Sequence, residues 1–171
     1  MNKAIGAAAI LLGCFAAALL RMRAKRTRIE ALLSLRAGLA ELRRALSERR
    51  HALREIFLRL ADRYEARPAG EFFHCLSQRM DALGECCFVE IWEAALRDKL
   101  AFLGEEVSDT LGALGLCLGG SELELQCRAL ERASADLDAI IQRDRDALPA
   151  EKRMSYGLSL CAGAMLLIML I

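Results

Sequence analysis

Residues 31–46 read ALLSLRAGLAELRRAL, and their leucines recur at intervals of three and four residues. This spacing places one set of leucines on a single narrow face of a helix: Leu32, Leu35, Leu39, Leu42 and Leu46. The charged residues fall off that face, so the stretch predicts a helix over about 27–47 that packs along an apolar seam. No glycine or proline separates Thr27 from the apolar residues before it, which favours one long helix reaching towards the N-terminus.

A second apolar seam lies near the other end of the chain and predicts a long helix over 121–148. Its positions are Leu123, Cys127, Leu130, Leu137, Ile141 and Leu148. Residues 21–50 carry ten basic and three acidic side chains, whereas residues 121–148 carry seven acidic and four basic ones. An antiparallel pair of the two helices is therefore matched in charge. Exposed ion pairs add about a few tenths of a kcal/mol each, so the seams must supply most of the stability.

Both ends of the chain are apolar: residues 4–20 and 155–171 contain no charged side chain. As a helix, each would extend about 26 Å, slightly less than a hydrocarbon core of about 30 Å, a gap that bilayer thinning or snorkelling can absorb. Basic residues flank both segments on the side that faces the middle of the chain: Arg21, Arg23, Lys25, Arg26, Arg28, Lys152 and Arg153. Such flanks stay in the cytosol. The prediction is an integral membrane hairpin with helices over 1–21 and 154–171, a cytosolic domain over 22–153, and both termini outside.

The first apolar segment also has features of a cleavable signal. Met1-Asn2-Lys3 precedes it, and Leu11-Leu12-Gly13-Cys14 resembles a lipoprotein cleavage box. Apolar residues nevertheless continue past Cys14, and a dense basic run follows directly. Both observations favour an uncleaved anchor.

Between the two seams, residues 48–118 predict a cap of short helices. Pro68 ends one helix and Gly84 the next, because proline cannot continue a helix and glycine favours a turn. A fourth helix contains Trp92, and a fifth begins near Phe102. The fold class is all-α, with a cytosolic bundle of about five to six helices between the membrane segments.

Glycines cluster at the end of that fifth helix. Gly119-Gly120 predicts a C-cap and turn, and Gly115 would let another helix approach closely. Ser121, with Glu124 three residues later, predicts a capping box at the start of the last helix.

The sequence contains no recognisable catalytic or metal-binding motif. It has no GxxxxGK[ST] and no HExxH, and the paired carboxylates at Glu105-Glu106 and at Asp136 and Asp138 fit solvated helix faces. The seven cysteines form no CxxC, and an odd count fits a reducing compartment. The pair Cys86-Cys87, near His74-Cys75, could be read as a metal or redox site, but incidental cysteines are favoured. The net charge of +1 argues against nucleic-acid binding. We expect a non-enzymatic protein without cofactor or metal.

Two local motifs resemble the stage III sporulation protein AB family. One runs from Leu114-Gly115 through Leu118-Gly119 to Glu122 and Gln126, and the other is Trp92-Glu93-Ala94-Ala95-Leu96. The resemblance covers the whole layout of the chain. Glu122 stands where the family usually has Asp, and His51-Ala52-Leu53 lacks the family's proline.

The resemblance implies a membrane protein similar to the platform subunit of type II secretion and type IV pilus machines. The family belongs to the SpoIIIA complex, which links mother cell and forespore and lies in the mother-cell-derived outer forespore membrane. The implied partners are a secretion-type ATPase in the mother-cell cytosol and other membrane channel subunits, and a homo-oligomer is compatible with the pattern.

Three functions follow as hypotheses. The first is a platform subunit that docks the ATPase. The second is a membrane-anchored scaffold or signal-transmitting hairpin unrelated to secretion. The third is a thiol enzyme that uses Cys86-Cys87. For the glycine motif, a tight crossing of two helices and a partner surface both remain open.

Overall fold

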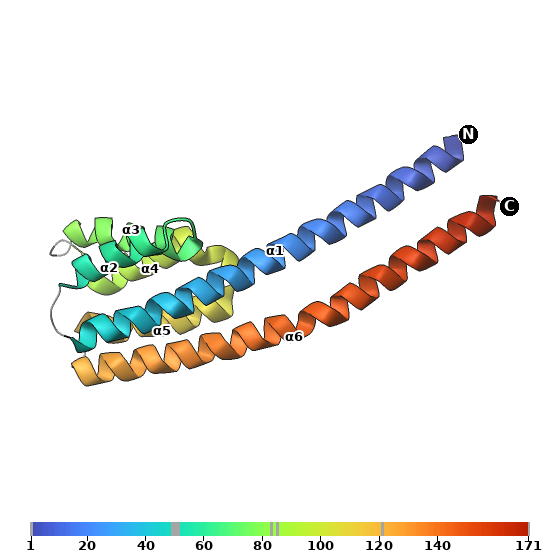
Figure 1. Ribbon diagram of the computed structural model, residues 1–171. Coiled ribbons are helices and arrows are strands. Elements are labelled where there is room, and N and C mark those ends of the chain that lie inside the picture. The colour runs from blue at the N-terminus through green and yellow to red at the C-terminus, as the bar shows by residue number, and fades with distance from the viewer. Residues whose placement is uncertain (1, 49–51, 83, 85, 121, 171) are drawn as a thin grey trace. The chain divides into compact units, whose positions relative to one another are not determined.

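The protein is an all-helical chain, as the sequence predicts. The computed structural model describes residues 2–48, 52–82, 84, 86–120 and 122–170, and within these it describes side chains for residues 13, 16, 19, 20 and 22–147 except Ala82. Within these described residues, six α-helices follow one another in chain order (Figure 1): α1 (Asn2–Ser47), α2 (Leu53–Arg63), α3 (Pro68–Arg79), α4 (Phe88–Leu100), α5 (Glu105–Gly120) and α6 (Leu123–Leu170). Two short 3-10 turns, η1 (Met80–Ala82) and η2 (Ala101–Leu103), follow α3 and α4.

The chain divides into two compact units. One comprises residues 30–141, which we call the helical bundle, and the other comprises residues 1–29 together with 142–171, which we call the terminal unit. α1 and α6 each contribute to both units, and α6 continues as one helix through Pro149. The expectation of a single long first helix is confirmed by the bounds of α1.

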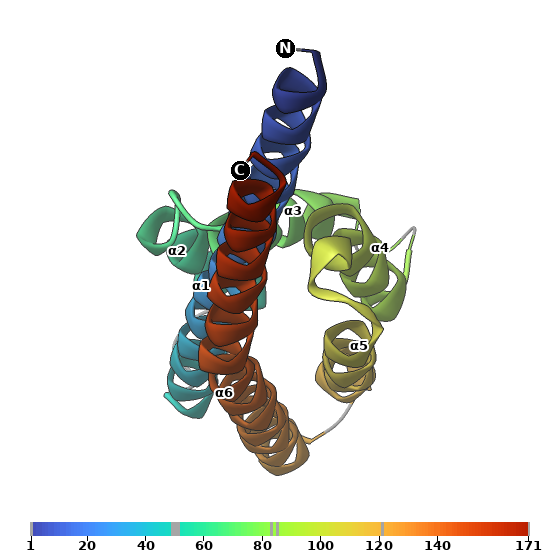
Figure 2. The same ribbon diagram turned by 90° about the vertical axis from the view of Figure 1, so that its right-hand side faces the viewer.

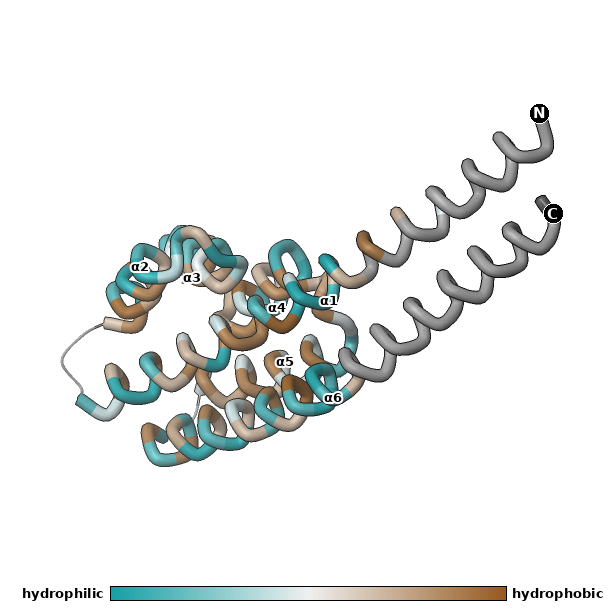
Figure 3. The backbone as a smooth tube through the Cα atoms, turned by 45° about the vertical axis from the view of Figure 1, so that its right-hand side comes forward, coloured by the Kyte–Doolittle hydropathy of each residue, from teal (hydrophilic) through white to brown (hydrophobic). Residues whose placement is uncertain are grey.

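The core of the bundle is built on the two predicted seams. Leu32, Leu35, Leu39 and Leu42 of α1 are fully buried, as are Leu130 and Leu137 of α6. Full burial of a leucine side chain contributes about 1.5–3 kcal/mol. Apolar residues recur between polar ones along the helices of the bundle (Figure 3), which is the pattern of helices that each bury one face.

The predicted charge match between the first and last helices is also present. In the bundle, Arg36 pairs with Asp138 at 2.9 Å, and Arg43 pairs with Glu131. The order of these pairs makes α1 and α6 antiparallel, and Figure 1 shows them side by side through the bundle. Within the terminal unit, Arg28 pairs with Asp144 at 3.3 Å.

An aromatic cluster joins α2, α3 and α4. Phe72 meets Trp92 edge to face, with ring centroids 5.2 Å apart, and Phe57 and Phe88 lie within 6.3 Å and 5.9 Å of the same indole. Gly38 of α1 lies against this cluster, since a Cβ there would stand 2.5 Å from the ring of Phe73. The cluster therefore fixes how α2, α3 and α4 pack on α1.

Several expected helix boundaries were wrong. The fifth helix begins at Glu105 rather than near Phe102, because Gly104 has a φ of 89°, a left-handed conformation that interrupts the helix. Gly119 and Gly120 are part of α5 instead of forming a left-handed cap. The break expected at Pro68 is present, since α2 ends at Arg63, and Pro68 itself begins α3 because its fixed φ suits a first helical position. The capping box predicted at Ser121 lies outside the described residues.

Within the part of the chain that the structure describes, none of the helices has a stretch both long and apolar enough to cross a membrane. Most side chains of the predicted spans 4–20 and 155–171 lie outside that description. The membrane hairpin therefore stays a prediction.

Candidate functional site

Two neighbouring helices, α4 and α5 (Figure 2), carry most of the residues of the two family motifs: Trp92 lies on α4, and Leu114, Gly115, Leu118 and Gly119 lie on α5. Trp92 of α4 is fully buried, and its indole Nε1–H donates a hydrogen bond of 2.7 Å to the carbonyl of Leu111 in α5. A Cβ added to Gly115 would lie 2.3 Å from Cδ1 of that indole. The position of the Trp92 indole therefore leaves room only for glycine at position 115. The close approach of another helix that was expected at Gly115 is present, and that helix is α4.

The next turn of α5 repeats this contact more loosely. A Cβ on Gly119 would lie 3.2 Å from the ring of Phe88 and 3.3 Å from the side chain of Val89. Leu114 and Leu118, the two leucines of the motif, are buried in the core. The Leu-Gly pairs thus pack α5 against α4.

Gln126 connects the same region to α6. Its Nε2 donates a hydrogen bond of 3.0 Å to the carbonyl of Leu118, in the last turn of α5 where backbone carbonyls lack helical partners. The side chain of Glu122 is exposed, and among the described residues it forms no ion pair. The structure brings Trp92, Gly115, Gly119 and Gln126 together as a packing unit and leaves Glu122 at the surface.

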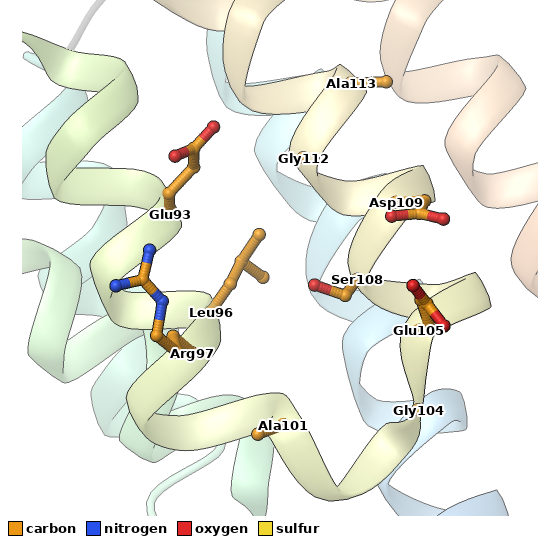
Figure 4. Close-up of a pocket in the computed structure, with 10 residues that line it drawn as sticks. All are labelled: Glu93, Leu96, Arg97, Ala101, Gly104, Glu105, Ser108, Asp109, Gly112 and Ala113. Atoms are coloured by element: carbon orange, nitrogen blue, oxygen red, sulfur yellow. The ribbon is translucent and has the colours of Figure 1, made fainter.

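A groove of about 550 Å³ opens between α4 and α5. Figure 4 shows Leu96 and Ser108 facing one another across it, with Glu93 and Arg97 on the α4 wall. The remaining lining residues are Ala101, Gly104, Glu105, Asp109, Gly112 and Ala113. We call this feature the α4–α5 groove. It presents three carboxylates, from Glu93, Glu105 and Asp109, against the single guanidinium of Arg97.

The α4–α5 groove was not predicted from the sequence, in which Glu105 fits a solvated helix face. One signal was available: Glu105, Asp109 and Gly112 recur at intervals of four and three, which places them on the same face of α5. A Cβ at Gly112 would meet nothing within 4 Å, so this face is open.

The cysteines show no shared site among the described residues, which contain no group of three or more His, Cys, Asp or Glu side chains arranged to hold a metal ion. Cys86 and Cys87 are exposed, and Cys75 is buried. Cys87 is the N-cap of α4, where its backbone N–H donates to the Glu90 carboxylate at 3.1 Å.

The predicted topology determinants lie in the terminal unit. Arg23 and Arg26 are exposed, Lys25 is half-buried, and Arg28 forms its ion pair with Asp144. The side chains of Arg21, Lys152 and Arg153 lie outside the described residues.

The fold is thus an all-α bundle with two long antiparallel helices and a close α4–α5 crossing. The chain belongs to the stage III sporulation protein AB family, whose sequence pattern matches residues 3–171. A solved structure described as stage III sporulation protein AB (SpoIIIAB) has the same fold, with a TM-score of 0.66 over 72% of this chain and 98% of that chain, at 21% sequence identity. No curated protein matches the chain. Membership of the family supports a role in sporulation, within the SpoIIIA complex.

Proposed function

We propose that the chain is a non-enzymatic membrane platform subunit of the SpoIIIA complex. In this proposal, the two terminal segments anchor it in the mother-cell-derived membrane, and the helical bundle docks a secretion-type ATPase in the mother-cell cytosol. The family match over residues 3–171 supports the proposal by linking the chain to sporulation.

One structural observation carries the anchoring half. α1 and α6 are antiparallel partners in the bundle through Arg36–Asp138, and they are partners again in the terminal unit through Arg28–Asp144. Each helix also runs on without interruption, α1 to Asn2 and α6 to Leu170. A membrane hairpin requires two helices that lie next to each other where they reach the membrane, as α1 and α6 do at Arg28–Asp144. The residues beyond this pair include the apolar, uncharged segments of the sequence.

The docking half is tested by recruitment of the ATPase to membranes. The ATPase of the same organism is produced in a heterologous bacterium with or without the full chain, and membranes are separated from the soluble fraction. We expect the ATPase in the membrane fraction only when the full chain is present, because the ATPase itself is soluble in this proposal. A chain that enters the membrane and leaves the ATPase soluble would contradict docking.

A further inference from the structure

The α4–α5 groove gathers acidic side chains that have no cationic partner among the described residues of the bundle. Six other carboxylates of the bundle each pair with a cation from another helix or turn: Glu41 with Arg63, Glu71 with Lys99, Asp81 with Arg54, Asp98 with Arg79, Glu131 with Arg43 and Asp138 with Arg36. In contrast, Glu93, Glu105 and Asp109 form no ion pair within the described residues. The groove therefore concentrates negative charge that the bundle does not neutralise.

The floor and one end of the groove are apolar. Leu96 is buried between the walls, and Gly112 leaves the backbone of α5 uncovered. Leu116 lies four residues beyond Gly112 and so continues the same face of α5, where its side chain is 62% exposed. A ligand that lies along this face of α5 would contact the carboxylates of Glu105 and Asp109 at one end and the exposed side chain of Leu116 at the other.

We propose that the α4–α5 groove binds a cationic, amphipathic segment of the ATPase, with Arg or Lys side chains on Glu93, Glu105 and Asp109 and an apolar side chain on Leu116. This assignment rests on the proposed docking function. An Arg or Lys of the partner supplies the charge that the three carboxylates lack, and partial enclosure of the groove strengthens such pairs relative to open solvent.

A second copy of the chain suits the groove less well. The cations that the bundle presents are largely engaged, because Arg36, Arg43, Arg54, Arg63, Arg79 and Lys99 each pair with a carboxylate of the same bundle. The countercharge is therefore expected from a different protein.

The test measures the affinity of the detergent-solubilised full chain for the ATPase of the same organism. The double variant Glu93→Lys/Asp109→Lys reverses charge at mid-helix positions on both walls, where no described ion pair is lost. Its control is Asp62→Lys/Glu65→Lys, which changes the charge equally at exposed sites at the end of α2 and beyond it. We expect at least a tenfold loss of affinity for the groove variant and less than a twofold change for the control.

The variant Glu93→Gln/Asp109→Asn guards against misfolding, because it keeps side-chain size and should keep the circular dichroism and melting temperature of the wild type. We expect this variant to bind the ATPase severalfold more weakly than the wild type does, and we expect the affinity of the wild-type chain for the ATPase to fall as the salt concentration is raised.

If the wild-type chain binds the ATPase and all groove variants bind it like the control, the groove assignment is wrong while the docking proposal stands. If the variants instead dissociate an oligomer of the chain, the occupant is a second copy and the proposal fails. If the wild-type chain does not bind the ATPase, both the docking proposal and the groove assignment are wrong.

Discussion

Replacing Gly115 by alanine is expected to lower the free energy of unfolding by about 1–3 kcal/mol, although alanine normally favours a helix. The added Cβ would stand 2.3 Å from Trp92 Cδ1. The indole cannot move aside easily, because it is fully buried against Phe72 and its N–H is held by the carbonyl of Leu111. Gly115→Leu should disrupt the crossing altogether. Thermal unfolding of the full chain in detergent, followed by circular dichroism, measures the effect.

Gly112→Ala is the matched control, one turn earlier on the same helix. A Cβ there meets nothing within 4 Å, so the substitution should stabilise the protein by up to about 1 kcal/mol through helix propensity alone. The two variants are therefore expected to shift the melting temperature in opposite directions. A stabilised Gly115→Ala protein would show that the Trp92–Gly115 contact does not constrain α5.

Leu39→Ala is expected to destabilise the protein by about 2–5 kcal/mol, because Leu39 is fully buried at the centre of the α1 seam and truncation leaves a cavity.

Asp138→Asn removes the charge that pairs with Arg36 on the surface between α1 and α6. Both partners are about half exposed, so this change should cost no more than about 1 kcal/mol. Denaturant unfolding compares the two.

Leu125→Ala controls for the loss of leucine atoms on a surface, since Leu125 of α6 is 52% exposed. It should change stability by less than about 1 kcal/mol. A cost of Asp138→Asn equal to that of Leu39→Ala would assign the α1–α6 pairing to charge rather than to the apolar seams.

The long helices could be predicted because their signals are local and repeated. Leu32, Leu35, Leu39 and Leu42 identify one buried face without reference to any other part of the chain. The opposite charges of the two helices then predicted their antiparallel pairing, which the order of the pairs Arg36–Asp138 and Arg43–Glu131 confirms.

The α4–α5 region was predicted only in part, because its features depend on which helices meet. The sequence indicated a close approach at Gly115 but could not identify Trp92 as its partner, since that contact joins residues from separate helices. The periodic run through Leu103, Val107 and Leu111 hid the break at Gly104, whose φ is fixed by the turn. The groove needs both walls in place, and neither wall alone distinguishes Glu105 or Asp109 from an ordinary exposed carboxylate.

The platform account depends most on a bundle that faces the cytosol while both ends of the chain are held in the membrane. Labelling of single cysteines with a membrane-impermeant thiol reagent tests this arrangement directly. Cys86 is suited to the measurement because it is exposed in the structure. One variant keeps Cys86 alone, and a second carries Asn2→Cys in a background without other cysteines. The account predicts that, in intact cells, the reagent labels the Asn2→Cys variant and reaches Cys86 only after the cells are permeabilised. Labelling of Cys86 in intact cells would contradict it.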